Sequence, residues 1–389
     1  MNYSRSVASL QPSATLQLTA RAAELTRQGR SIIALSAGQP DFPSPAAARE
    51  AAVRAMEQGR TGYTATAGIP ELREAVAVAT SRRRGIEFRP AEVVVSCGAK
   101  HSLANLLMAV INPGDRILIP LPYWVSYPEM VRLAGGVPAF PSSGHSLVTA
   151  ADVEEAAASG VSGVILNSPG NPSGCVYTAG EARALADALA ATHMWVISDD
   201  IYEDLVFTGS PAPHILDFRP ELRERAVIVS GVSKTFAMTG WRIGWAVAPV
   251  DWAKLAIRVQ EHTTSNPCSI SQWASLAVVS GAAEAERRTM LSSFASRRDL
   301  ICSLLDGIPG MSFPRPEGAF YVFAGYPESA GLPSAELCGL LLDEAGLAVI
   351  PGSAFGVENR LRLSFAASDE DIRGGVERLA SFLAKRGIR

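Results

Sequence analysis

The chain has 389 residues, with 35 lysines and arginines against 38 aspartates and glutamates, and 48% of its residues are hydrophobic. A chain of this length can bury one large core or, as we expect here, the cores of two domains. The net charge of -3 is spread along the sequence, and the one basic cluster, Arg82 to Arg84, ends a helical pattern. We therefore expect no nucleic acid partner.

Membrane, secretory and metal-binding signals are not found in the sequence. The longest uncharged apolar stretch, Ile117 to Val125, contains two prolines and is far shorter than the roughly 20 residues of a membrane span. Met1 to Arg21 lacks the basic and apolar blocks of a secretory signal. The five cysteines include no Cys-x-x-Cys pair, and the five histidines are far apart. These observations predict a cytoplasmic protein with no membrane segment and no metal.

The elements predicted first along the chain are a helix and a strand, Ile32 to Leu35, within Ser13 to Gln39. Helical patterns then alternate with short β-branched segments, which is typical of βαβ units and a mainly parallel sheet. The predicted strands are 92–96, 116–120, 164–167, 194–198 and 226–230, and the predicted helices include 70–84, 99–111 and 178–191.

The pattern changes past about Ala283 to a long charged helix, a stretch rich in proline and glycine, shorter strands and a final helix. We expect an α/β protein with a large domain over 44–285, in which helices flank a mainly parallel sheet. A smaller α+β domain follows over 286–389, and an N-terminal segment, 1–43, is associated with it.

Lysine is rare in this chain, because all but four of the 35 cations are arginine. A lysine is therefore a candidate for chemistry that a guanidinium cannot perform, above all the attack of a neutral amine on a carbonyl. Lys254 and Lys385 lie in polar helical contexts, where chance explains them. Lys100 and Lys234 remain as candidates.

The densest group of candidate residues, 230–244, follows the predicted strand 226–230 and includes Lys234 and Arg242. Ligands of open α/β sheets bind beyond the carboxyl ends of strands, although a lysine there can also be an ordinary surface residue. The segment resembles the cofactor-lysine motif of the pyridoxal-phosphate (PLP)-dependent aminotransferases of fold type I, class I/II. The resemblance covers nearly the whole chain. It implies that Lys234 forms a Schiff base with PLP and that Arg242 binds the cofactor phosphate.

Further positions match this family one by one. Asp199 closes a predicted strand and resembles the aspartate that pairs with the pyridine nitrogen, where a carboxylate favours the protonated, electron-accepting ring. Tyr202 and Asn171 match the residues that bind the ring oxygen of the cofactor. Trp124 resembles the aromatic residue that stacks on the pyridine, although a core tryptophan is an equally good reading of that position alone.

The cofactor phosphate needs backbone donors as well as an arginine. The phosphate-binding turn of the family falls on Gly98, Ala99 and Lys100, at the start of a predicted helix. Gly231 replaces a phosphate-binding serine of the aspartate subgroup, and Ser233 or Ser230 could substitute for it.

Contacts between subunits are implied by the resemblance. Tyr63 matches a tyrosine that reaches the phosphate of the neighbouring subunit, so a homodimer with shared active sites is implied. Ser265 to Pro267 matches a second segment that crosses between subunits.

Substrate binding is implied at both ends of the chain. Arg362 matches the arginine that binds the substrate α-carboxylate, with Arg360 on the same strand face as the alternative. The backbone of Gly38 matches a second carboxylate contact. Lys100 matches a lysine that binds a side-chain carboxylate in the bacterial-type subgroup, and Thr15 resembles its partner in members that also accept prephenate.

The resemblance implies a ping-pong transfer of the amino group between L-aspartate and 2-oxoglutarate, small-molecule amino and 2-oxo acids being the partners. Aspartate/prephenate and aromatic aminotransferases are alternatives, and a PLP-dependent lyase on the same fold is a rival enzyme. A transcription regulator that senses PLP is disfavoured, because nothing basic precedes Gly38 as a DNA-binding module would.

Overall fold

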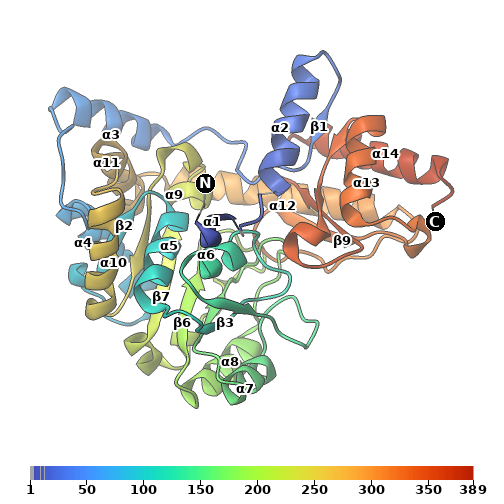
Figure 1. The fold of residues 1–389 in the computed structure, drawn as a ribbon. Helices are drawn as coiled ribbons and strands as arrows, with labels where there is room; N and C mark the ends of the chain where they lie inside the picture. Colours follow the sequence, from blue (N-terminus) through green and yellow to red (C-terminus); the bar gives the residue numbers. More distant parts are fainter. Residues whose placement is uncertain (1–3, 9, 13, 389) are drawn as a thin grey trace.

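The computed structural model describes residues 4–8, 10–12 and 14–388, and Figure 1 shows their arrangement. Residues 1–3, 9 and 13 of the predicted N-terminal segment, including Ser13, where the portion with the predicted helix and strand begins, lie outside the described residues. A seven-stranded sheet has the strand order β2-β8-β7-β6-β5-β3-β4. Strand β8 is antiparallel to both neighbours and the other pairs are parallel. The seven strands are β2 (Val93–Ser96), β3 (Arg116–Leu118), β4 (Val137–Ala139), β5 (Gly163–Leu166), β6 (Trp195–Asp199), β7 (Ala226–Gly231) and β8 (Gly244–Val247).

Helices flank this sheet (Figure 1), so the predicted α/β class with a mainly parallel sheet is confirmed. Strands β2, β5 and β7 are buried along their whole length, as strands covered on both faces should be. The helices are α3 (Ala46–Glu57), α4 (Pro70–Arg84), α5 (Ala99–Val110), α6 (Tyr127–Leu133), α7 (Ala150–Ala158), α8 (Ala179–Ala190), α9 (Val232–Thr235), α10 (Val250–Thr263) and α11 (Ser269–Ala277).

The starts of two predicted helices have clear local causes. Helix α4 begins with Pro70, whose fixed φ and missing N–H suit the first helical position. Helix α8 is preceded by Thr178, whose hydroxyl accepts from the Glu181 N–H while the Glu181 carboxylate accepts from the Thr178 N–H. This reciprocal pair satisfies two backbone donors that the helix itself cannot.

The remaining helices and strands, except α1 (Arg5–Ala8), which lies beside α6, form a second body at the right of Figure 1, reached through the long helix α12 (Glu284–Asp306). Strand β1 (Ile33–Ala34) pairs in parallel with β10 (Leu347–Ala348), which ties the N-terminal segment to the C-terminal part of the chain. The predicted domain limit at 285 falls in the first turn of α12, and the exact limits stay a prediction. The other elements are α2 (Ala14–Arg27), β9 (Tyr321–Gly325), α13 (Ser334–Leu340), β11 (Ile350–Pro351), β12 (Arg360–Ser364) and α14 (Asp369–Lys385).

The described residues contain neither a helix suited to a membrane span nor a cluster of metal-ligating side chains. Over residues 4–8, 10–12 and 14–388, none of the helices is long and apolar enough to cross a membrane. The same part of the chain contains no group of three or more His, Cys, Asp and Glu side chains placed to hold a metal ion.

Candidate active site

A cavity of about 320 Å³ lies at the carboxyl ends of strands β5, β6 and β7, where ligands of open α/β sheets bind. The N-terminal segment and strand β12 contribute to its wall, so residues from both ends of the chain meet there. Twelve of the predicted site residues line it: Thr15, Gly38, Ala99, Lys100, Trp124, Asn171, Asp199, Tyr202, Ser233, Lys234, Arg242 and Arg362.

Lys234 lies on the short helix α9, directly after strand β7. Its Nζ donates a hydrogen bond to the carbonyl oxygen of Gly38 over 2.6 Å. Desolvation in the pocket, with Arg362 and Arg242 nearby, lowers the pKa of Lys234 to about 8. A substantial fraction of this amine is therefore neutral near physiological pH, which is the form that attacks a carbonyl.

Asp199 is the last residue of β6 and is buried. The hydroxyl of Tyr127 donates to its Oδ2 over 2.6 Å, and the backbone N–H of Ile201 donates to its Oδ1 over 3.3 Å. Burial raises the pKa of Asp199 to about 6, against the lowering effect of these two hydrogen bonds. The carboxylate is thus mostly ionised at pH 7 and can pair with a protonated ring nitrogen.

Buried ion pairs stabilise the turn that follows Asp199. Arg84, at the end of helix α4, donates to Asp200 over 2.9 Å and to Glu203 over 3.0 Å. Ser230 donates to the other oxygen of Glu203 over 3.0 Å. Arg84, from the basic cluster Arg82 to Arg84, thus has a structural role. Of the two serines considered as substitutes at the phosphate site, Ser233 lines the cavity, whereas Ser230 does not and bonds Glu203 instead.

An anion cradle is formed where helix α5 begins. Gly98 precedes this helix with a φ of 88°, and a Cβ placed on it would lie 2.6 Å from Nη2 of Arg242. Arg242, also at positive φ, is oriented by hydrogen bonds from Nη1 to the Thr239 carbonyl and from Nη2 to the Cys97 carbonyl. Only glycine lets the guanidinium approach the helix N-terminus so closely, and both features attract a phosphate.

Arg362 lies on strand β12 with 2% of its surface exposed. Its Nη1 donates to Oδ1 of Asn171 and its Nη2 to the carbonyl of Ser36, each over 3.0 Å. The Nε atom is buried and has no hydrogen-bond partner among the described residues. A guanidinium carries five donors, so this one is fixed in place and keeps donors for a carboxylate.

Lys100 and Trp124 form one side of the cavity. The Lys100 Nζ lies 4.7 Å from the centre of the Trp124 ring, a cation–π contact. Partial desolvation and the charge of Arg242 lower the pKa of Lys100. Thr15, on helix α2, lines the same cavity.

Two residues considered in the sequence lie away from the cavity. Tyr63 is 96% exposed, between α3 and α4, and does not line the cavity. Arg360 donates from Nη1 to the Phe323 carbonyl over 3.2 Å and is also absent from the lining. Of the two arginines on β12, Arg362 is therefore the one that faces the site.

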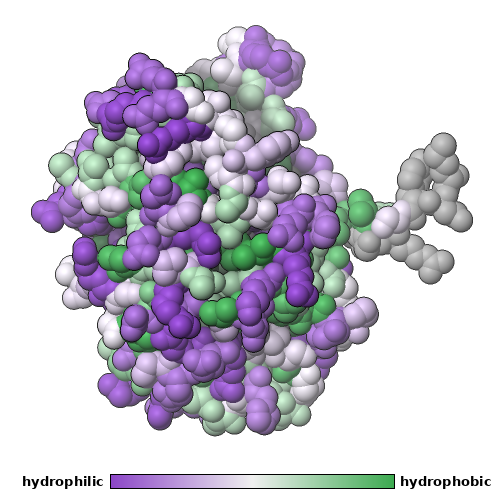
Figure 2. All heavy atoms as spheres, turned by 90° about the vertical axis from the view of Figure 1, so that its left-hand side faces the viewer, coloured by the Kyte–Doolittle hydropathy of each residue, from purple (hydrophilic) through white to green (hydrophobic). Residues whose placement is uncertain are grey.

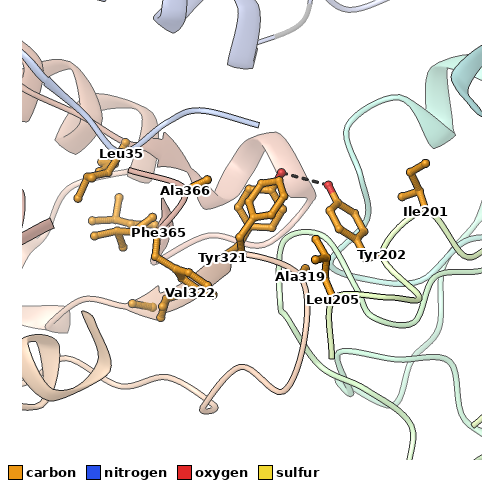
Figure 3. Close-up of a cluster of buried hydrophobic side chains, with 14 of the residues drawn as sticks. Leu35, Ile201, Tyr202, Leu205, Ala319, Tyr321, Val322, Phe365 and Ala366 are labelled. Atoms are coloured by element: carbon orange, nitrogen blue, oxygen red, sulfur yellow. Dashed lines mark hydrogen bonds between the residues drawn. The ribbon is translucent and has the colours of Figure 1, made fainter. Parts of the chain in front are cut away.

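Sequence reasoning missed two tyrosines that line the cavity, Tyr127 and Tyr321. The Tyr321 hydroxyl lies 3.1 Å from that of Tyr202, as Figure 3 shows. Tyr127 follows Trp124 by three residues in the same segment, which is a weak signal. Nothing local distinguishes Tyr321 from the apolar residues of its strand.

An amine, a buried carboxylate and an anion cradle at the strand ends of an α/β sheet, together with a buried arginine from strand β12 of the smaller sheet, define an enzyme that handles anionic carbonyl and amino compounds. Comparison with known sequences gives its class, since the profile of the family "Aminotransferase class I and II" matches residues 30–379. The chain belongs to this family and is an enzyme that transfers amino groups.

Curated relatives match over nearly their whole lengths. The chain is 42% identical to "Aspartate aminotransferase" of Geobacillus stearothermophilus, covering 99% of this chain and 100% of that protein. It is 41% identical to "Aspartate/prephenate aminotransferase" of Cereibacter sphaeroides, with 98% of each covered.

Solved structures show the same similarity. The aspartate aminotransferase of Thermus thermophilus with maleate superposes with a TM-score of 0.92 at 39% identity, covering 98% of this chain and 99% of that one. The Rhizobium meliloti aspartate aminotransferase gives a TM-score of 0.91 at 38% identity, with 98% of both chains covered.

Members of this family use PLP, and the cavity fits that group. Gly98 leaves room against Arg242 that a side chain would fill, which suits a phosphate. Asp199 offers a buried carboxylate that would suit the ring nitrogen, and the amine of Lys234 lines the same cavity, where it would suit the aldehyde.

Proposed function

We propose that this chain binds PLP through Lys234 and transfers the amino group between L-aspartate and 2-oxoglutarate by a ping-pong mechanism. The observation that carries the proposal is the convergence of Lys234, Asp199 and Arg242 with Arg362 on one cavity. The first three suit the aldehyde, ring nitrogen and phosphate of the cofactor. The fourth suits the α-carboxylate of a substrate.

PLP, when bound, supplies an aldehyde and an electron sink for the bond that breaks at the substrate α-carbon. Asp199 holds a proton on the ring nitrogen, and Tyr202 with Asn171 orients the ring oxygen. Arg362 anchors the substrate so that its α-hydrogen faces the Lys234 amine. The Lys234 Nζ, once free, takes the α-proton and returns it on the cofactor side, so one residue is both anchor and general base.

A second cation in the cavity supports a dicarboxylic substrate. Lys100 lines the same cavity as Arg362, and an amino acid with a side-chain carboxylate can pair with both. The names of the relatives, aspartate and aspartate/prephenate aminotransferase, agree with such a substrate. Thr15, which lines the same cavity as Lys100, keeps prephenate as the second candidate, because the ring carboxylate of prephenate would use that lysine.

We also propose a homodimer whose sites share residues. Figure 2 shows apolar side chains among hydrophilic ones on the face that bears α3, α4 and α10. Val53 and Met56 of α3 are about half exposed, and Tyr63 next to them is 96% exposed. Covering this face with a second copy would bury these side chains and allow Tyr63 of the partner subunit to reach the phosphate cradle.

The cytoplasmic location stays a prediction.

Initial rates with a panel of amino donors and 2-oxoglutarate test the proposal, with both the 2-oxo acid and ammonia measured. Aspartate should give the highest kcat/KM, with oxaloacetate and glutamate formed in equal amounts and without ammonia. Release of ammonia without transfer would identify a lyase instead. Light scattering should give twice the monomer mass, and a monomer with full activity would contradict the shared site.

A further inference from the structure

Tyr321 connects two parts of the site that belong to different bodies of the molecule. It begins strand β9 in the C-terminal body and is fully buried. Its hydroxyl lies 3.1 Å from the hydroxyl of Tyr202, in the turn after β6. Figure 3 shows the two side chains pointing toward each other from separate segments, joined by this hydrogen bond.

The ring of Tyr321 also contacts the substrate-binding arginine. Its centre lies 4.3 Å from Cζ of Arg362, on the neighbouring strand β12. Burial raises the pKa of Tyr321 and that of Tyr202, and the positive charge of Arg362 opposes both shifts. The field of Arg362 therefore acts on both phenolic oxygens.

The hydroxyl of Tyr321 also lies close to Gly38, the residue whose carbonyl accepts a hydrogen bond from Lys234. A Cβ placed on Gly38 would lie 3.6 Å from the Tyr321 oxygen, and the carbonyl of Gly38 accepts the hydrogen bond from Lys234. Tyr321 thus lies between the substrate-carboxylate site, the ring-oxygen site and the amine.

We propose that Tyr321 is a positioning residue that couples occupancy of the Arg362 site to the proton affinity of the cofactor linkage at Lys234, acting through Tyr202. The inference rests on the proposed function, in which Tyr202 donates its hydrogen to the ring oxygen of PLP. Tyr202 must then accept from Tyr321, because a hydroxyl has one proton to give. A hydroxyl that accepts a hydrogen bond is a stronger donor, so Tyr321 strengthens the Tyr202 bond to the ring oxygen.

A carboxylate bound at Arg362 changes this chain of interactions. It offsets the positive charge that stabilises electron density on the two phenolic oxygens. The hydrogen-bond donor strength of the Tyr202 hydroxyl changes in turn. This change shifts the pKa of the nitrogen that joins Lys234 to the cofactor. Substrate binding thereby changes the pKa of the reacting nitrogen although the bound carboxylate at Arg362 does not contact this nitrogen.

The test uses the PLP-loaded enzyme and follows its visible absorption against pH, with and without saturating maleate as the dicarboxylate probe. In Tyr321→Phe the ring over Arg362 remains and only the hydroxyl is lost. The midpoint of the absorption change should rise by about 0.3–1 pH unit, and the maleate-induced shift should fall to half or less of its normal size. Tyr326→Phe is the matched control, because its buried hydroxyl bonds the Leu332 carbonyl far from the cavity.

A double-mutant cycle with Tyr202→Phe separates coupling from a merely structural effect. If Tyr321 acts through Tyr202, adding Tyr321→Phe to Tyr202→Phe should not move the midpoint further. Additive shifts, or a Tyr321→Phe enzyme with the normal midpoint and maleate shift, would overturn the inference. A parent enzyme without any pH-dependent visible band would instead contradict the proposed function. Thermal unfolding of each variant confirms that it is folded.

Discussion

The substitution that best distinguishes the two arginines of strand β12 is Arg362→Lys, compared with Arg360→Lys as its matched control. Both changes keep a positive charge, lie two residues apart on one strand and replace a planar fork by a single ammonium. Arg362 is 2% exposed and lines the cavity, whereas Arg360 is partly exposed, donates to the Phe323 carbonyl and does not line the cavity.

The expected magnitude follows from the bonds at Arg362. Its two terminal nitrogens donate hydrogen bonds to Asn171 and Ser36. The guanidinium is therefore already oriented before a carboxylate binds to it. A lysine cannot reproduce both anchors and the carboxylate contact. Loss of one hydrogen bond between charged groups costs about 1.5–3 kcal/mol, so kcat/KM for aspartate should fall about ten- to a hundredfold. Arg360→Lys should change it less than about threefold, since exposed cations contribute little.

Steady-state rates with aspartate and 2-oxoglutarate measure this difference, and thermal unfolding checks that both variants are folded. The fall should be seen for every amino donor, because all share the α-carboxylate. A large loss in Arg360→Lys together with normal kinetics in Arg362→Lys would refute the assignment. A loss in Arg362→Lys confined to aspartate would mean that this arginine binds the side-chain carboxylate.

Four further predictions follow from the same geometry. Lys234→Ala and Lys234→Arg should both lose turnover and the visible absorption of the bound cofactor, and turnover in either variant would refute the role of this lysine. Asp199→Ala should keep cofactor binding but lose several orders of magnitude in kcat, whereas a rate within about tenfold of the parent would mean that another acid serves the ring nitrogen. Lys100→Ala should lower kcat/KM for aspartate about ten- to a hundredfold and leave phenylalanine nearly unchanged, and equal losses would assign Lys100 to the cofactor. Because the pKa of Lys234 is lowered to about 8, reductive alkylation of this lysine in the cofactor-free chain should increase as pH rises through about 8. Arg362→Gln removes a positive neighbour and should move the midpoint of this increase to higher pH. Mass spectrometry of the labelled lysine measures the midpoint, and an unchanged midpoint in Arg362→Gln would mean that the charge of Arg362 has no effect.

The fold was accessible from the sequence because its main elements have strong local signals. Helix α4 matches its predicted range, 70–84, and α8 begins one residue after Thr178, the predicted start of the helix 178–191. Strand β3 is shorter than the predicted 116–120, since Pro120 has no N–H to continue a ladder. Strands such as β4, with three residues, carry too few side chains to produce a periodic pattern.

Much of the site was also accessible, because Asp199 and Lys234 follow buried strands and a strand end in a parallel sheet is a predictable place for a ligand. Tyr321 was not, since its role comes from a neighbour 119 positions earlier in the chain. The match to the family motif favoured Arg362 over Arg360, although both lie on one strand face by their spacing. Burial and the partners at Asn171 and Ser36 give the physical difference between the two arginines, which the sequence does not show.

The charges that line the cavity explain why its ligands must be anionic. Asp199 is the only acidic residue among the described lining residues, which include four cations: Lys100, Lys234, Arg242 and Arg362. This excess of positive charge is part of the reason that the pKa of Lys234 lies near 8. An anion at Arg242 or Arg362 cancels a charge that lowers this pKa, so each bound phosphate or carboxylate makes the Lys234 amine more basic. The lowered pKa keeps a fraction of the Lys234 amine neutral and able to attack a carbonyl, and an anion at either arginine raises the proton affinity of this amine, which suits the role of general base proposed for it.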